Sequence, residues 1–595
     1  MPQSPALNSD GPVRVTVSCD GQPQAVLPLI SLTVRHALNS VSWARLVIQD
    51  GDMPLGTVPL SDGNLFKPGA LISISAGYGD DEEPIFSGLL VRHGFRIFGE
   101  NDSRLELECR HPACKMTLGR RSAHYVDQTD SAIIQSLISA HGLSAEVDST
   151  TAQHKLLAQH YCSDWDFMLA RAELMGLVLQ CEDGKLVVKA PALSTAPALH
   201  VTWGADLIDF SADIDARSQW TAVQASSWSL DSQALLQGSS ESPGADAGQG
   251  NLDGAALAGV ASPATVALQS CAPQTKDVLD AWAKSTQLKA TLARHRGQLS
   301  FQGNALARPG TVLELKGVGT RFNGKCYLSA VQHEISDGNW ISHAEFGMPP
   351  DWQMQRPDVK APANAGLLPG VRGLHIGKVV KLDADPEGQQ RIQISLPALM
   401  ADTPTIWARL AQFHASNGFG SFFLPEVDDE VIVGFFNDDP SHPVVLGSLY
   451  SSSRVPPYAL AAENNTKAVV TRYKHRLIFD EEKKSITIET ASKNTLILDD
   501  EGKQCVLKDQ NGNSITLDQN GITLDSVKDI KMTAQANIQG DATAKISWSA
   551  TADYSAKGLN VSAEAQVGFT AKGAATAELS ASGQTTVKGA LVMIN

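Results

Sequence analysis

Alternating apolar and polar positions dominate this sequence and predict a mainly β protein. Short stretches of alternation occur at 13–17, 71–76, 85–91 and 105–109, each bounded by turn residues. Apolar residues at every second position are typical of strands that bury one face. We therefore expect a first β-barrel-like domain over residues 1–125.

A different periodicity interrupts the strands over residues 126–200. Asp130 and Ser131 are placed to cap a helix carrying four apolar residues, and Asp164 is placed to cap a second helix that ends near Gly176. We expect a helical α/β segment here.

Strand patterns resume over residues 201–350, which we interpret as a second β-barrel-like domain. Residues 231–275 are rich in Ser, Gly, Ala and Gln without sustained periodicity, and they predict a flexible loop. Residues 351–370, rich in Pro, Ala and Gly, predict a linker. A further all-β unit follows over 371–460.

The tail, residues 461–595, has no proline after Pro457. Because proline breaks a hydrogen-bond ladder, we expect the tail to be continuous β structure. A unit of apolar, any, apolar and acidic residues recurs and predicts stacked rungs. Its copies are 477–480, 486–489, 496–499, 515–518 and 522–525.

Strict alternation then continues from Ala542, with one slip of phase at Lys557-Gly558. Its apolar face is mostly alanine, too small for one chain to offset the entropy of ordering. We therefore expect several chains, three in our interpretation, to share a core as an intertwined β-prism. An amyloid-like tail is the alternative, disfavoured because charged residues recur on the outward positions. The larger predicted core residues are Ile546, Trp548, Tyr554, Leu559, Val561, Val567, Phe569 and Leu579.

Composition narrows the function classes. The chain has 595 residues, 43% of them apolar, which is enough to bury a core. Its formal net charge of −16 disfavours binding to nucleic acid or to an anionic membrane, because both partners need a basic face. The N-terminus lacks a signal-peptide pattern, so we expect synthesis and assembly in the cytoplasm. Eight scattered cysteines without a C-x-x-C pair predict reduced thiols.

Candidate enzyme motifs are weak, and we expect no catalytic, cofactor-binding or metal-binding residues. The segment 319–326 has the glycine and lysine spacing of a phosphate loop, but Cys326 replaces the Ser/Thr and a strand pattern follows. His333-Glu334 lacks the second histidine of a metalloprotease helix. Paired acids such as Asp428-Asp429 are expected in turns. A hydrolase in the N-terminal half stays a rival, testable by activity lost on substituting one carboxylate.

The unit at 371–460 carries a dense set of motifs, among them 377–379, 385–388, 407–409, 418–420, 437–440 and 443–450. In this order they resemble the OB-fold domain of VgrG proteins and of contractile-phage baseplate spikes. The resemblance rests most on a signature of Pro425, Glu426, Val427, Asp428, Asp429, Glu430 and Gly447.

Upstream motifs, including Asp164-Trp165-Asp166-Phe167 with Arg171, resemble the hub of the same family. Residues 116–120 and 125–131 are most similar to the branch found in extracellular phage-tail-like particles; type VI secretion is the alternative. The resemblance implies a homotrimer with two barrel-like hub domains per chain, an OB collar and a β-helical needle, which adapts a hexameric tube to threefold symmetry and punctures a target membrane. The implied partners are inner-tube initiator proteins, baseplate wedge proteins and effector cargo, and the implied location is a released particle.

Two spacings refine this expectation. Only residues 451–466 separate the OB unit from the next strands, which leaves no room for a lysozyme domain of the kind some phage spikes carry. The last histidine is His475, so no histidine-bound metal is expected at the needle's end. We instead expect Leu591, Val592, Met593 and Ile594 to bind a tip protein, which by resemblance is of the PAAR type; filling of the last core layer is the alternative.

Overall fold

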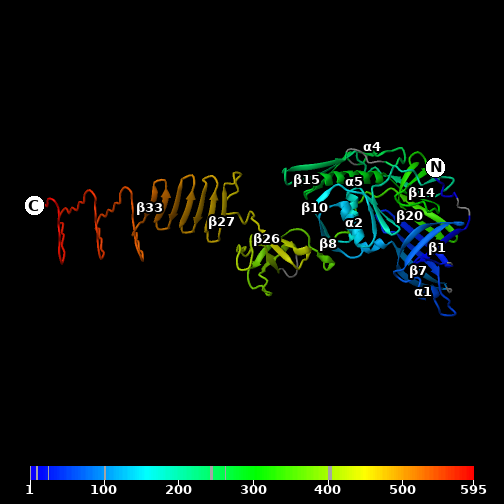
Figure 1. The fold of residues 1–595 in the computed structure, drawn as a ribbon, viewed down its shortest axis with the longest axis horizontal. Helices are drawn as coiled ribbons and strands as arrows, with labels where there is room; N and C mark the ends of the chain where they lie inside the picture. The colour runs from blue at the N-terminus through cyan, green and yellow to red at the C-terminus, as the bar shows by residue number, and fades with distance from the viewer. Residues whose placement is uncertain are drawn as a thin grey trace. The chain divides into compact units, whose positions relative to one another are not determined.

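The computed structural model describes residues 2–7, 11–24, 26–99, 102–240, 246–261, 263–399 and 405–594. Contacts divide the chain into two compact units, Met1–Leu449 and Tyr450–Asn595. The fold is mainly β, as the pattern predicts (Figure 1). Among the described residues, no helix is both long and apolar enough to span a lipid bilayer.

The strands of the first β-rich region form one part of a large sheet and enclose an apolar core of their own. Leu46, Ile48, Ile72 and Ile74 are fully buried there. Their alternation with exposed residues is what the sequence pattern predicts. The elements are β1 (Val13–Cys19), β2 (Gln22–Pro23), β3 (Leu29–Ala37), β4 (Trp43–Gln49), α1 (Pro59–Asp62), β5 (Leu71–Tyr78), β6 (Asp81–Phe98) and β7 (Asp102–Arg110).

The second β-rich region, the second barrel-like part that the pattern predicts, shares a sheet with the first. Its strand β20 pairs antiparallel with β3, with Val331 opposite His36, so both regions share a 13-stranded sheet. Each region keeps its own core, the second one around Phe301 and Phe346. The elements are β13 (Leu199–Thr202), β14 (Leu207–Ile214), β18 (His295–Gln302), β19 (Val312–Lys316), β20 (Gly324–Ser336) and β21 (Asn339–Phe346).

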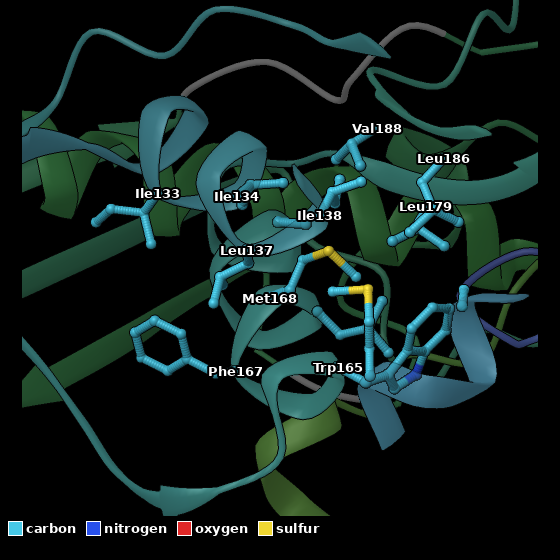
Figure 2. Close-up of a cluster of buried hydrophobic side chains, with 14 of the residues drawn as sticks. Ile133, Ile134, Leu137, Ile138, Trp165, Phe167, Met168, Leu179, Leu186 and Val188 are labelled. Carbon is cyan, nitrogen blue, oxygen red and sulfur yellow. The ribbon is translucent and has the colours of Figure 1, made fainter. Parts of the chain in front are cut away.

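The expected helical segment is present and has an apolar core of its own, in which the side chains of two helices and a hairpin meet (Figure 2). Thr129 and Ser163 cap the two helices through their hydroxyls, one residue before the expected aspartates. The elements are η2 (Pro112–Thr117), β8 (Arg121–Thr129), α2 (Asp130–Ala140), β9 (Ser144–Val147), β10 (Gln153–Cys162), α3 (Asp164–Leu174), β11 (Val178–Glu182) and β12 (Lys185–Lys189).

Residues 231–275 are not a structureless loop, contrary to our expectation; residues 241–245 and 262 lie outside the described part. A three-stranded sheet packs against a long helix, and Gly238 allows the contact, since a Cβ there would lie 2.6 Å from the backbone of Leu279. The elements are β15 (Ala222–Ser229), β16 (Ala234–Ser240), α4 (Gly254–Leu257), β17 (Thr265–Ser270) and α5 (Lys276–Arg294).

The expected linker at 351–370 is docked on the first unit, at least in its first half. The Gln353 backbone N–H donates to Glu173 Oε2 at 2.7 Å, and Val359 is buried. The Arg120 guanidinium donates to the carbonyls of Asp358 and Lys360. Two short helical turns lie in this stretch, η3 (Gln353–Gln355) and η4 (Ala363–Gly366).

A closed barrel of order β22-β23-β24-β26-β25 follows, and it confirms the expected OB-type unit. Its core contains Val379, Ile394, Val431 and Val433, all fully buried. The elements are β22 (His375–Lys381), β23 (Ile392–Ser395), η5 (Pro397–Leu399), β24 (Thr405–Leu410), β25 (Glu430–Phe435), η6 (Phe436–Asp438) and β26 (Pro443–Ser448).

The second unit begins with a seven-stranded antiparallel meander, drawn as a ladder of rungs in Figure 1. The strands match the repeated sequence unit. They are β27 (Thr466–Val470), β28 (Arg476–Asp480), β29 (Ser485–Glu489), β30 (Thr495–Asp499), β31 (Gln504–Lys508), β32 (Ser514–Asp518) and β33 (Gly521–Asp525). The described residues 526–594 contain no strand, which differs from our expectation of continuous β structure.

A buried ion cluster joins the helices of the first unit and gives a test of its packing. Asp130 is fully buried, and its carboxylate accepts hydrogen bonds from Arg171 Nε at 2.5 Å and Arg171 Nη2 at 3.1 Å. His154 Nε2 lies 2.8 Å from Asp130 Oδ2. This cluster explains why Arg171, one of the residues that carry the hub resemblance, occupies its position on α3.

We predict that Arg171→Met lowers the free energy of unfolding of the first unit by about 3 kcal/mol, because Asp130 then keeps a buried charge with only His154 as partner. Lys155→Met is the matched control, since its ion pair with Asp127 is exposed and should contribute little. Differential scanning calorimetry of the full chain measures both. Equal effects of the two substitutions would contradict this role.

Candidate functional site: the five-stranded barrel and an apolar sheet face

The barrel signature forms a tight turn that precedes β25 and is hydrogen-bonded to β22. The Asp428 N–H donates to the Val379 carbonyl at 2.8 Å, and the Val379 N–H donates to the Asp429 carbonyl at 3.0 Å. Asp429 Oδ2 accepts from the Glu426 N–H at 2.8 Å. The paired acids therefore shape a loop, as expected from their place in the sequence.

The remaining signature residues continue this turn into the barrel. Asp428 has a φ of 72°, a left-handed conformation that aspartate tolerates, and its carboxylate pairs with Lys378 Nζ at 2.8 Å. The Glu430 carbonyl accepts from the Leu449 N–H at 2.9 Å, and Gly447 lies opposite Ile432 on β26. Pro425 and Val427 flank the turn, and Val427 is exposed.

A second acidic motif, Asp385 to Gly388, is also structural. The Arg391 guanidinium donates to both carboxylate oxygens of Asp385, and the backbone N–H groups of Gln389 and Arg391 donate to the same carboxylate. These hydrogen bonds, that of the Arg391 side chain first, hold the pKa of Asp385 well below its usual range. The motif closes the β22–β23 connection.

The meander of the second unit presents one apolar face that no other described part of this unit covers. In each strand from β28 to β33 the second and fourth residues point to this face. Cross-strand pairing aligns them in two ladders, with Leu496 opposite both Ile488 and Leu507. The first ladder is Leu477, Ile488, Leu496, Leu507, Ile515 and Leu524; the second is Phe479, Ile486, Leu498, Cys505, Leu517 and Ile522.

Exposure of these ladders is substantial in the single chain. Ile488 is 49% exposed, Leu507 50% and Leu524 53%. The opposite face carries Ser, Thr, Glu, Asp, Lys and Arg at the ends of most strands. A contiguous apolar face of this kind marks an interaction site.

In three of the five sequence units, the acid that ends the unit accepts a hydrogen bond within the turn that follows. Asp480, Asp499 and Asp518 each accept a backbone N–H of the following turn, from Lys483, Gly502 and Asn520. In the turns at the opposite ends of the strands, the side chains of Thr471, Thr490 and Asp509 each accept a hydrogen bond from the backbone N–H of the residue four positions later. The repeat is therefore a pair of strands, each pair closed by side-chain caps.

The predicted needle-core residues lie in the part of the tail without strands, and the structure brings none of them together. Ile546, Trp548, Tyr554, Leu559, Val561, Val567, Phe569 and Leu579 are all exposed. The four predicted tip residues Leu591, Val592, Met593 and Ile594 are exposed as well. A single chain offers no partner for their alternating pattern, so their roles remain predictions.

Sequence reasoning missed one exposed aromatic group on the barrel. Phe413, Phe419, Phe422 and Phe423 all lie in the loop before the signature turn, and Phe413 is fully exposed. Four phenylalanines within a Gly/Ser/Asn-rich loop were the available signal. The strand that the sequence predicts from Cys326 onward, where a phosphate loop would begin a helix, is confirmed, because Cys326 lies in β20 and pairs with Leu313 of β19.

Two parts of the chain match known protein families. Residues 375–450, the closed barrel, match the family described as the type VI secretion system/phage-baseplate injector OB domain. This match identifies the barrel as an injector-type OB domain and covers the barrel alone. Residues 9–337 match the Alg8 N-terminal domain, more than half of the chain, so the chain belongs to the Alg8 N-terminal domain family.

Curated relatives match over short regions. The spike protein VgrG3 of Vibrio cholerae is 30% identical over 111 residues, 17% of this chain and 11% of the relative. VgrG4b of Pseudomonas aeruginosa is 40% identical over 68 residues, 11% of this chain and 8% of the relative. The matched region thus spans about a tenth of these relatives.

Solved structures show weak likeness. A prophage MuSo2 tail protein of Shewanella oneidensis has a TM-score of 0.43 at 9% identity, covering 57% of this chain and 98% of that one. A type VI secretion component of E. coli has a TM-score of 0.38 at 11% identity, covering 73% and 99%. At these scores the likeness carries no conclusion about function.

Proposed function

We propose that this chain is the central hub and spike of a contractile injection system baseplate. The injector-type barrel and the VgrG relatives support this assignment. In the proposal, the first unit sits at the end of a hexameric inner tube, the barrel forms a collar, and the second unit forms a needle driven through a target membrane when a sheath contracts.

The observation that carries the proposal is the uncovered apolar face of β28–β33. Strands of five residues are roughly 17 Å long, so each meander is a narrow ribbon that cannot curl over its own face. Three ribbons whose apolar faces meet would bury both ladders in one core and turn the opposite face outward, which has polar strand ends around a central row that includes Ile478, Ile497 and Val506. We therefore propose a homotrimer, with the alternating residues from 542 onward continuing the shared core.

The role we propose is mechanical, with chemistry supplied by cargo. Its support is that the carboxylates of Asp385 and Asp429 accept backbone hydrogen bonds within their turns and that of Asp428 pairs with Lys378. The proposed partners are inner-tube initiators, baseplate wedge proteins and effector cargo. We place the complex in a released phage-tail-like particle assembled in the cytoplasm; a type VI secretion apparatus is the alternative.

We further propose that Leu591, Val592, Met593 and Ile594 bind a small tip protein of the PAAR type. Four consecutive apolar side chains are exposed there. Removal of these four residues should leave the oligomer intact and abolish co-purification of a co-expressed tip protein, and retained binding would refute the assignment.

Two adjacent residues test the trimer. Leu496 points to the apolar face and Ile497 to the opposite face. We predict that Leu496→Asp prevents assembly, because three charges would be buried together in the shared core. Ile497→Asp is the matched control and should leave assembly intact.

Light scattering coupled to size-exclusion chromatography measures the result. The expected mass is three times 63.3 kDa for the wild type and for Ile497→Asp, and lower for Leu496→Asp. A wild-type chain that is monomeric, or a trimer unaffected by Leu496→Asp, would refute the proposal.

A further inference from the structure

A cavity of about 220 Å³ lies in the first unit where its three parts meet. Strands β3 and β6 supply one wall, the β11–β12 hairpin a second, and β20 with the loop at 305–309 a third. The barrel and the needle do not contribute to it. The cavity is therefore independent of the assembly proposed above.

One buried histidine in the cavity wall has an unused donor. His333 is 2% exposed, and its Nδ1 lies 2.9 Å from Ser342 Oγ and 3.4 Å from Trp340 Nε1. Because the Trp340 N–H can only donate, Nδ1 is an acceptor and the ring proton resides on Nε2. This Nε2–H has no hydrogen-bond partner among the described residues.

The other histidines of the wall are satisfied. His36 contacts Ser42 Oγ at 2.9 Å and the Ile85 carbonyl at 2.7 Å. His111 Nε2 lies 2.8 Å from the Glu182 carbonyl, and its Nδ1 accepts from the Ala113 N–H. His333 is thus the histidine of this cavity with a donor to spare.

Arg308, an exposed arginine, lines the same cavity as this donor. Arg308 is held by its Nε to the Ala305 carbonyl at 3.2 Å and by its Nη2 to the Pro84 carbonyl at 3.3 Å, both from residues of the cavity wall. Its guanidinium forms no ion pair with a described carboxylate. Burial lowers the pKa of His333 to about 3, and the positive charge of Arg308 contributes in the same direction.

The other charged residues that line the cavity are Lys185, Glu182 and Asp183, so with Arg308 the wall has two cations and two anions. Lys185 pairs with Glu182 at 3.2 Å and with Glu146 at 2.9 Å, which leaves Arg308 as the cation of the wall that forms no ion pair with a described carboxylate. Asp183 is exposed at the turn of the hairpin. Ile85 and Phe86, both buried, supply an apolar surface.

From this arrangement we propose that the cavity binds a small organic carboxylate. The carboxylate lies between the Arg308 guanidinium and His333 Nε2–H, and its apolar body lies against Ile85 and Phe86. An ionised acceptor can take charge-assisted hydrogen bonds from His333 Nε2–H and from the Arg308 N–H groups that do not donate to the Ala305 and Pro84 carbonyls. At about 220 Å³ the cavity selects ligands smaller than drug-sized molecules.

The test uses the full chain and 4-fluorobenzoate as the probe, followed by ¹⁹F NMR line broadening. We expect saturable binding that Arg308→Met weakens about tenfold to a hundredfold, since a hydrogen bond to a charged group is lost. Arg321→Met is the control, because Arg321 is an exposed arginine of the same unit that lies outside the cavity and donates to Asn251.

A neutral isostere, 4-fluorobenzamide, makes the test independent of any variant. We expect it to bind the wild-type chain about tenfold more weakly than 4-fluorobenzoate. Absence of benzoate binding, equal affinity for the amide, or equal effects of the two arginine substitutions would each overturn the proposal.

Discussion

The second unit depends on one constraint: its strands place two apolar side chains per rung on a face that the same chain leaves uncovered. Side-chain caps close the turns, those of Asp480, Asp499 and Asp518 among them, and each strand from β27 to β33 has five residues. The cross-strand register places each ladder residue opposite the next one. In the proposed trimer, a second and a third copy of the chain would cover the ladders with a surface of the same repeat.

The first unit follows a different principle, since it covers its own apolar surfaces. Pairing of β20 with β3 joins regions about 300 residues apart in sequence into one sheet. The helices α2 and α3 add a third core, held at its edge by the buried pair of Asp130 and Arg171. The same convergence of three parts leaves the cavity around His333.

Local pattern predicted most strands and both helices of residues 126–200, and the family resemblance of the motifs at 371–460 predicted the barrel. The local pattern failed where contacts between residues distant in sequence determine the structure. Residues 234–240 and 265–270 look like loop because they are rich in small and polar residues, yet they pair with β15 and are covered in part by α5. The sheet shared by β3 and β20 is a long-range pairing that neither strand encodes alone. Likewise, Arg308 and His333 line one cavity only because the fold brings the loop at 305–309 and β20 together.

The proposed needle requires that the two apolar ladders are buried in the assembled protein. Cys505 lies on the second ladder and Cys271 on the first unit, and both thiols are exposed in the single chain. A brief pulse of maleimide on the native protein, read by peptide mass spectrometry against the denatured chain, measures their accessibility. The account predicts that Cys505 is strongly protected by the neighbouring copies; a Cys505 that reacts as fast in the native protein as in the denatured chain would contradict it.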